Sequence, residues 1–353
     1  MTPRRRRAPA DAAPAARVTL RVLADQLGLS PASVSLVLNR APAAHAIPPA
    51  TQERIRAAAS ASGYRPNTIA KSLRHHRTLT IGVLVPEIRE GYSALVMSGI
   101  EDALLQAGYL YFVTSHRHRA DLVDEYPRLM LDRSVDGLIL IDTPIAAPLP
   151  VPVVAVSGHS QVDGVTNIVV DHGRAAAQAL AHLRALGHRR VAFIKGQPFS
   201  SDTAVRWHTI RAAARAERIA IDPALVGQLT GNSPLPDLGY LAARALMRVR
   251  PRATALFAFN DISAMGAIRA LRETGLRVPE DVSVLGFDDI PSAAYQHPGL
   301  TTIRQPLYEM GQRAADTLVT RMERPGEAVP RTISLEPSLV VRGTTATVRP
   351  ARP

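Results

Sequence analysis

Histidine pairs are the first candidates for chemistry in this 353-residue chain. His75-His76 and His116-Arg117-His118 place imidazoles close together, an arrangement that can hold a metal ion. Neither pair belongs to a His-Glu-x-x-His pattern or has a carboxylate partner at ligand spacing. The chain has no cysteine, which removes thiolate metal clusters, disulfides and a cysteine nucleophile. We therefore expect no metal site and no cofactor.

Enzymatic motifs are also missing from the chain. It contains neither a glycine-rich phosphate loop nor a Gly-x-Ser-x-Gly nucleophile elbow. An enzyme remains an alternative hypothesis, but no constellation of residues supports it, and we expect no catalytic residues.

Basic side chains are concentrated at the N-terminus. The formal net charge is +12, and residues 1–80 hold thirteen Arg or Lys against three acids, so they carry +10 of it. A basic head on a near-neutral body is typical of an anion-binding module joined to a separate domain. Arg4–Arg7 could add phosphate contacts, or the tail could be solvated and without a role.

Residues 1–17 combine this arginine run with Ala and Pro, which predicts a disordered tail. No apolar stretch like that of a secretory signal follows it, and no run of about 18 apolar residues occurs anywhere. We expect a cytoplasmic protein without a membrane segment.

Helical periodicity follows the tail over residues 18–63. Thr19 can cap a helix from Leu20 to Leu27, Gly28 ends it, and Ser30-Pro31 begins a second helix through Leu38. A third helix is expected over about 49–62. Two helices joined by a three-residue glycine turn predict a helix-turn-helix.

Beyond residue 79, apolar strand runs alternate with amphipathic helices, which predicts parallel sheets covered by helices on both faces. About 260 residues of this texture exceed one core, so we expect two lobes with a ligand cleft between them. The expected strands are 80–85, 109–114, 137–141, 153–156, 166–170, 190–194, 255–259 and 282–286. The expected helices include 93–107, 174–186, 204–216, 238–247 and 262–273.

Ordered motifs along residues 18–343 resemble the lactose-repressor (LacI/GalR) family of bacterial transcription regulators. The matching segments are Val18-Thr-Leu, Leu27-Gly-Leu-Ser-Pro-Ala-Ser-Val-Ser-Leu-Val-Leu-Asn39, Gly63-Tyr-Arg-Pro-Asn67, Ala70-Lys-Ser-Leu-Arg74, Thr80-Ile-Gly-Val-Leu-Val-Pro86, Val135-Asp-Gly-Leu-Ile139, Leu186-Gly-His188, Phe259-Asn-Asp261, the run from Val278 to Asp289, and Leu300-Thr-Thr-Ile303.

The resemblance implies an all-α helix-turn-helix domain (18–63), a hinge helix (64–78) and a two-lobed α/β domain like that of periplasmic binding proteins (79–343). Lobe boundaries are expected at 79–170 with 303–333, and at 171–302 with 334–343, followed by a tail over 344–353. It further implies a homodimer on near-palindromic operator DNA that is controlled by a sugar-type effector.

The family's DNA contacts fall on the second helix and on the hinge. Ser30, Ser33 and Ser35 would donate to phosphates, and Pro31, Ala32 and Leu36 would face the bases. Because none of the last three forms a bidentate hydrogen bond, base preference would come from thymine methyls and DNA shape, or the operator is an unusual one. The hinge residues implied are Asn67, Ala70, Lys71, the wedge Leu73 and Arg74. An ordinary interdomain linker is the alternative for this segment.

Effector contacts map by the same resemblance to Glu90, Tyr92, Ser157, Arg206, Asn260 and Asp288. Asn260-Asp261 and Asp288-Asp289 each follow a strand, so we also expect them to cap helices. A solute receptor without a DNA role is the alternative function, and the basic helical head argues against it.

Overall fold

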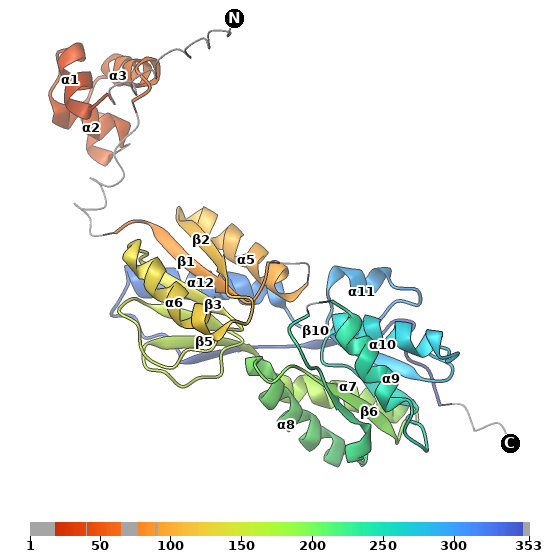
Figure 1. Ribbon diagram of the computed structural model, residues 1–353. Coiled ribbons are helices and arrows are strands. Elements are labelled where there is room, and N and C mark those ends of the chain that lie inside the picture. The colour runs from red at the N-terminus through yellow and green to blue at the C-terminus, as the bar shows by residue number, and fades with distance from the viewer. Residues whose placement is uncertain (1–17, 40, 65–76, 89–90, 234, 349–353) are drawn as a thin grey trace, which may run out of the picture. The chain divides into compact units, whose positions relative to one another are not determined.

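The computed structural model describes residues 18–39, 41–64, 77–88, 91–233 and 235–348. It divides into a helical unit that ends before Arg77 and a larger α/β unit that begins there (Figure 1). Within these ranges no helix has the length and apolar character needed to cross a membrane.

The helical unit confirms the expected helix-turn-helix. Its elements are α1 (Leu20–Leu27), α2 (Pro31–Leu38), the 3-10 helix η1 (Pro42–Ala46) and α3 (Pro49–Ala61). The Thr19 hydroxyl caps α1, and Gly28 ends it with a φ of 67°, a left-handed conformation that glycine adopts without strain. Leu23, Val34 and Ile55 are fully buried in the small core between the helices.

The connection between α2 and α3 is folded rather than loose. Gln52 of α3 donates through Nε2 to the carbonyl oxygens of Ala44 and Ile47, both at 2.9 Å. These two bonds tie η1 to the first turn of α3.

Two six-stranded sheets form the α/β unit (Figure 1). The first has the order β11-β5-β4-β3-β1-β2, and every pairing in it is parallel. Its strands are β1 (Thr80–Val85), β2 (Leu110–Ser115), β3 (Gly137–Ile141), β4 (Val153–Val156), β5 (Val165–Val170) and β11 (Thr332–Leu335).

The second sheet has the order β12-β10-β9-β8-β6-β7, in which only the edge strand β12 is antiparallel. Its strands are β6 (Val191–Lys195), β7 (Val226–Gln228), β8 (Ala255–Phe257), β9 (Ser283–Asp288), β10 (Thr301–Arg304) and β12 (Ser338–Val340). The predicted α/β class with parallel sheets is therefore confirmed.

Each sheet defines a lobe, and the chain crosses between the lobes three times. It leaves the first sheet after β5, returns after β10 and leaves again after β11. Lobe 1 therefore comprises residues 77–170 and 305–337, and lobe 2 comprises 171–304 and 338–348. The first return thus follows Arg304, two residues later than the expected boundary.

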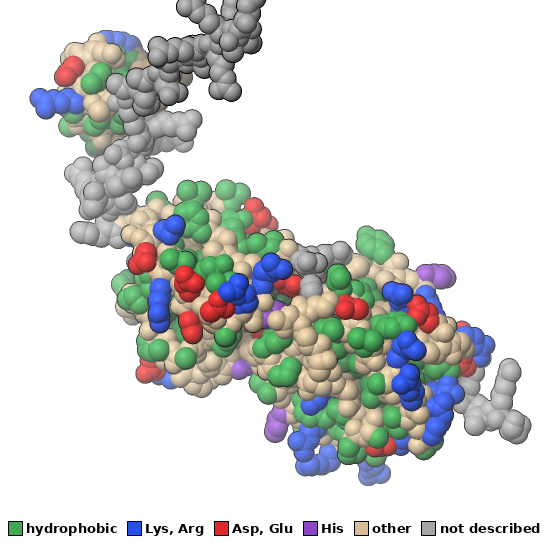
Figure 2. Space-filling view, viewed as in Figure 1, with side chains coloured by type: hydrophobic (Ala, Val, Ile, Leu, Met, Phe, Trp, Pro, Cys, Tyr) green, Lys and Arg blue, Asp and Glu red, His purple; other side chains and the backbone are tan. Residues whose placement is uncertain are grey.

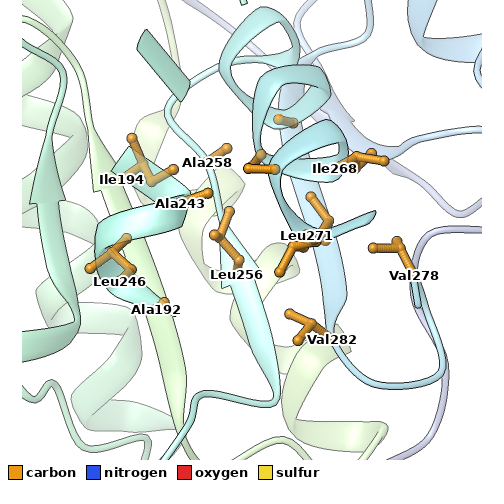
Figure 3. Close-up of a cluster of buried hydrophobic side chains, with 14 of the residues drawn as sticks. Ala192, Ile194, Ala243, Leu246, Leu256, Ala258, Ile268, Leu271, Val278 and Val282 are labelled. Atoms are coloured by element: carbon orange, nitrogen blue, oxygen red, sulfur yellow. The ribbon is translucent and has the colours of Figure 1, made fainter. Parts of the chain in front are cut away.

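Helices cover both faces of each sheet, and the buried apolar residues of the central strands β3, β4, β6, β8 and β9 accordingly alternate between two apolar clusters. Lobe 1 contains α5 (Tyr92–Ala107), α6 (Ala120–Asp132) and α12 (Leu307–Glu323). Lobe 2 contains α7 (His172–Ala185), α8 (Ser201–Ala216), the 3-10 helix η2 (Pro223–Leu225), α9 (Asp237–Leu246), α10 (Asp261–Glu273) and α11 (Pro291–Tyr295). Figure 3 shows one of these clusters, where Leu256 of β8 and Leu271 of α10 lie among buried aliphatic side chains.

Net charge differs in sign between the two lobes. Lobe 1 contains ten Arg or Lys and sixteen Asp or Glu, whereas lobe 2 contains eighteen and eleven. On the face in Figure 2, basic side chains gather over lobe 2. The near-neutral body therefore consists of an acidic half and a basic half.

Glycines allow two pairs of helices to touch. A Cβ at Gly311 of α12 would lie 2.0 Å from the carbonyl oxygen of Val96 in α5, and a Cβ at Gly266 of α10 would lie 1.8 Å from that of Pro236, just before α9. Side chains at these positions would push the helices apart.

The variant Gly311→Ala should therefore lower the free energy of unfolding by about 1–3 kcal/mol, because the added methyl group overlaps backbone that cannot move locally. Denaturant unfolding measures the change. Gly326→Ala is the matched control, since a Cβ there meets nothing within 4 Å. Equal stability of the two variants would contradict the close contact.

Candidate functional site

A cavity of about 140 Å³ lies between the lobes, at the carboxyl ends of the parallel strands. One water needs roughly 10–15 Å³ of such volume, so the cavity holds on the order of ten waters or one small ring. Lobe 1 supplies Pro86, Glu87, Tyr92, Ser93, His118 and Asp142, and lobe 2 supplies the rest of the lining, including Phe199, Asp202, Arg206, Phe259, Asn260 and Asp288.

Arg206 of α8 is the central cation of this cavity. Its side chain is buried, and its guanidinium lies 3.8 Å from the ring centroid of Phe287 and 4.4 Å from that of Phe259. It donates to the Phe259 carbonyl oxygen at 2.6 Å and to the Asp202 carboxylate at 2.9 Å. Its Nε is buried without a hydrogen-bond partner among the described residues.

Asp202 lies one helical turn before Arg206 and collects three donors. Besides Arg206, His159 and His172 donate to it through Nε2 at 2.8 and 3.1 Å. Burial works to raise the pKa of Asp202, but His172, His159 and Arg206 together hold this pKa well below its ordinary value. The buried carboxylate is therefore ionised and fixes the guanidinium.

His159, His172 and Asp202 also form the one group of three potential metal ligands in the described part of the chain, with ligand atoms within 4.8 Å of one another. The hydrogen bonds account for this cluster, because one carboxylate oxygen serves both imidazoles and the other serves Arg206. A divalent cation would lie beside the positive guanidinium.

The histidine pairs seen in the sequence have other surroundings. His116 contacts the Thr143 hydroxyl at 3.0 Å, and burial lowers its pKa to about 4. The ring of His118 packs on Phe199, with centroids 4.1 Å apart. His75 and His76 lie outside the described residues.

Asp142 links the two lobes. It follows β3 in lobe 1, and its Oδ1 accepts from the Ser201 backbone N–H at 3.0 Å and from the Ser201 hydroxyl at 2.7 Å. Ser201 begins α8, and the N-cap residue Ser200 makes no side-chain cap of its own. A carboxylate of one lobe thus caps a helix of the other, where the helix dipole favours negative charge.

Burial raises the pKa of Asp142 to about 6, and repulsion from Asp202 adds to the effect, while the Ser201 donors oppose it. The Asp142 carboxyl, which caps α8 from the other lobe, therefore changes its charge near pH 6.

The side chain of Tyr92, which lines the cavity, contacts that of Ser157, which does not. The Tyr92 hydroxyl lies 2.6 Å from the Ser157 hydroxyl, and burial raises the pKa of Tyr92 well above its ordinary value. Ser157 is 1% exposed and does not line the cavity. Its hydroxyl orients the tyrosine rather than facing a ligand directly.

Asn260 confirms the expected cap. Its side chain accepts from the Ser263 backbone N–H at 2.9 Å, and the Ser263 hydroxyl accepts from the Asn260 N–H in return. Asp261, fully buried below it, accepts from the Ile290 N–H and the Thr302 hydroxyl.

The expected capping by Asp288-Asp289 is wrong. Asp288 instead accepts from Gln305 Nε2 at 2.7 Å, and Asp289 forms ion pairs with Arg304 and Arg342. The helix that follows, α11, begins without a side-chain cap.

Burial raises the pKa of Asp288 to about 7. Arg206 and Gln305 work against this rise, and the charges of Asp202 and Asp142 add to it. Solvent and neighbouring groups therefore stabilise the negative charge of Asp288 in the cavity wall only in part.

Four of the six expected effector residues line the cavity together: Tyr92, Arg206, Asn260 and Asp288. Ser157 lies one contact behind them, and Glu90 is outside the described residues. Asp142 and Asp202 were not expected from the sequence. Asp142 directly follows a buried strand, and Asp202 precedes Arg206 by four residues, so both signals were present.

Two of the serines expected to contact DNA from α2 form hydrogen bonds within the helix or its caps. The Ser30 hydroxyl accepts from the Ser33 N–H as N-cap, and Asn39 Nδ2 donates to the Ser35 hydroxyl. Pro31 and Ala32 are exposed on the first turn of α2. Leu36 is half-buried and packs against the core of the helical unit, which limits the surface that it can offer to DNA.

The five hinge predictions lie outside the described residues: Asn67, Ala70, Lys71, Leu73 and Arg74.

Comparisons with known proteins agree with this architecture. A periplasmic binding protein-like domain matches residues 180–345. The HTH-type transcriptional repressor PurR of Aliivibrio fischeri is 30% identical over 340 residues, covering 92% of this chain and 97% of the relative. PurR of Haemophilus influenzae is 29% identical over 335 residues, with the same coverage.

Solved structures extend the likeness to the whole chain. The lac repressor dimer bound to operator and the anti-inducer ONPF has a TM-score of 0.83 and 27% identity, covering 94% of this chain and 99% of that one. The complex of the transcriptional regulator CelR with cellobiose has a TM-score of 0.67 and 30% identity, covering 93% and 100%.

A helix-turn-helix unit joined to a two-lobed domain with a ligand cavity defines the class of effector-controlled, DNA-binding transcriptional repressors. Within that class, the chain belongs to the LacI family of transcriptional regulators.

The variant Asp142→Asn tests the charge of the interlobe cap. The pKa of Asp142 is higher in the folded protein than in the unfolded chain, so the folded wild type holds this proton more tightly. Protonation of Asp142 therefore adds to the free energy of unfolding at low pH, and this contribution is lost as pH rises from about 4 to about 6. Across this pH window, the free energy of unfolding of the wild type should fall by about 1–2 kcal/mol relative to that of the variant. The expected change is smaller than the full pKa shift would give, because Asp142 is partly exposed to solvent.

Denaturant unfolding at several pH values measures the difference. Asp163→Asn, at an exposed ion pair with Arg331, is the matched control. A stability difference between wild type and Asp142→Asn that stays constant with pH would rule out the raised pKa.

Proposed function

We propose that this repressor binds a near-palindromic operator as a homodimer and that a carbohydrate-type effector in the interlobe cavity controls its affinity. One observation carries the proposal: Arg206, Asp288, Asn260 and Tyr92 converge on one cavity that both lobes line. Solved relatives were determined with ONPF, cellobiose and ribose, which supports a polyhydroxylated ligand.

Each of these side chains has a role that suits hydroxyl groups. The guanidinium of Arg206 donates to a ring or hydroxyl oxygen, and the carboxylate of Asp288 accepts from hydroxyls. Asn260 is held by its capping box, so its amide is pre-oriented. Tyr92 and Phe259 offer ring faces on which a sugar ring can stack.

Effector binding acts on DNA through the lobes. A ligand that contacts both lobes at once stabilises the closed cleft, because only the closed cleft allows both sets of contacts. Ligand binding therefore shifts the equilibrium from the open toward the closed cleft. In the mechanism that we propose, the shift moves the dimer interface and orders or melts the hinge helix around Leu73. Pro31, Ala32 and Leu36 then read the operator by apolar contact and DNA shape.

The edge of the first sheet supports a homodimer. Strand β2 is the outermost strand there, and its Leu110 and Phe112 are 75% and 49% exposed. Leu105, near the end of the adjacent helix α5, is 74% exposed. An unpaired edge with three large apolar side chains is the kind of surface that a second copy covers.

The operator prediction is checked by fluorescence anisotropy with DNA from the region upstream of the protein's own gene cluster. We expect tighter binding than to scrambled DNA of equal length, and affinity that falls as salt rises. Replacing Arg4–Arg7 by Ala should lower the slope of log affinity against log salt by about 0.9 for each phosphate that these arginines neutralise. Absence of salt-sensitive, sequence-preferring binding, both without sugar and with every candidate sugar, would contradict the proposal.

The variant Arg206→Lys should weaken effector binding without weakening operator binding. Lysine keeps the charge but loses the planar fork, so effector affinity should fall about 10-fold to 100-fold while operator affinity without effector is retained. Calorimetry and anisotropy measure the two quantities.

Because Arg206 is buried, loss of its charge would leave Asp202 with only its two imidazole partners. The double variant Asp202→Asn with Arg206→Met removes both charges and serves as the control for folding. Retention of the full effector response in Arg206→Lys would contradict the assignment.

A further inference from the structure

Acidic side chains outnumber basic ones in the cavity wall. The described lining contains four acids and two side chains that can be cationic, namely Glu87, Asp142, Asp202 and Asp288 against Arg206 and His118. Burial lowers the pKa of His118, which keeps this imidazole neutral near pH 7. Arg206 is then the one cation among the lining residues that the structure describes.

That cation is already engaged with one of the acids. Arg206 pairs with Asp202, which also accepts from two imidazoles. In contrast, the structure shows no ion pair to Asp142 or Asp288 within the described ranges. Asp142 accepts from neutral serine donors, and Asp288 accepts from the amide of Gln305.

The two carboxylates that form no ion pair within the described residues belong to opposite lobes. Asp142 follows β3 of lobe 1 and Asp288 ends β9 of lobe 2, and both line the same cavity. They act on each other, since the charge of Asp142 contributes to the raised pKa of Asp288. A cation bound between them would interact favourably with both lobes at once.

A second demand on the ligand comes from Arg206. Arg206 lines the cavity, and a guanidinium offers N–H donors that need oxygen acceptors, which an ammonium group cannot supply. Phe259, Leu238 and Ile262 line another part of the wall and suit the carbon face of a ring. The complementary ligand therefore combines one positive charge, oxygen acceptors and a compact ring.

We propose that the effector is a hydroxylated ring that carries a protonated amine, as amino sugars do, with the ammonium group between Asp142 and Asp288. This inference rests on the proposed function, because it takes the cavity as the effector site. It goes further by excluding neutral and acidic sugars as the preferred ligands.

Matched ligands test the charge directly on the full-length protein. Glucosamine, galactosamine and mannosamine are each compared with the parent hexose and with the N-acetyl derivative, and glucuronate serves as an anion. Calorimetry should give at least one amine that binds about tenfold or more tightly than both of its neutral partners. Its affinity should fall with added salt, whereas that of a neutral hexose should not.

Variants locate the charge in the cavity. Asp142→Asn should weaken amine binding about tenfold and reduce its salt dependence, while the control Asp163→Asn should change neither. Operator binding and circular dichroism show whether Asp142→Asn is folded. The salt dependence of the wild type provides the same information without any variant.

The outcomes separate the two proposals. A parent hexose or glucuronate that binds as tightly as the amine overturns the present inference and leaves a carbohydrate-controlled repressor standing. Amine binding unchanged by Asp142→Asn also overturns it. Failure of every probe to bind or to alter operator affinity counts against both this inference and the proposed carbohydrate-type effector.

Discussion

The buried ion pair between Arg206 and Asp202 is the interaction on which the cavity depends. A guanidinium is retained in a protein interior only if its charge and donors are met, and here a carboxylate, a carbonyl oxygen and two aromatic faces meet them. His159 and His172 meet the other side of the carboxylate. The cavity-lining arginine is therefore held in place by the protein alone, which would lower the entropic cost of binding the proposed effector.

Close packing fixes the helices within each lobe. Close glycine contacts bring α5 against α12 in lobe 1 and α9 against α10 in lobe 2. The lobes are joined by the chain crossings and by polar contacts, which include Asp142 with Ser201, His159 with Asp202 and Gln305 with Asp288. Because three of these groups line the cavity, a ligand bound there would touch residues that hold the two lobes together.

The sequence predicted most strands and helices within one to three residues, because apolar periodicity in parallel sheets is strong. It did not predict the short strands β7, β10, β11 and β12, which have three or four residues each and, apart from β10, at most one buried residue. Arg206 and Asn260 were found through motif resemblance. Asp142 and Asp202 were missed because their roles come from partners in distant segments, such as Ser201 for Asp142 and His159 for Asp202.

The opposite net charges of the lobes have an electrostatic consequence. Lobe 1 has sixteen acids against ten basic residues, and lobe 2 has eleven against eighteen, so the lobes attract each other over distances near the Debye length of about 8 Å. Rising ionic strength weakens this attraction. If the proposed effector closes the cleft, its affinity would therefore fall as ionic strength rises.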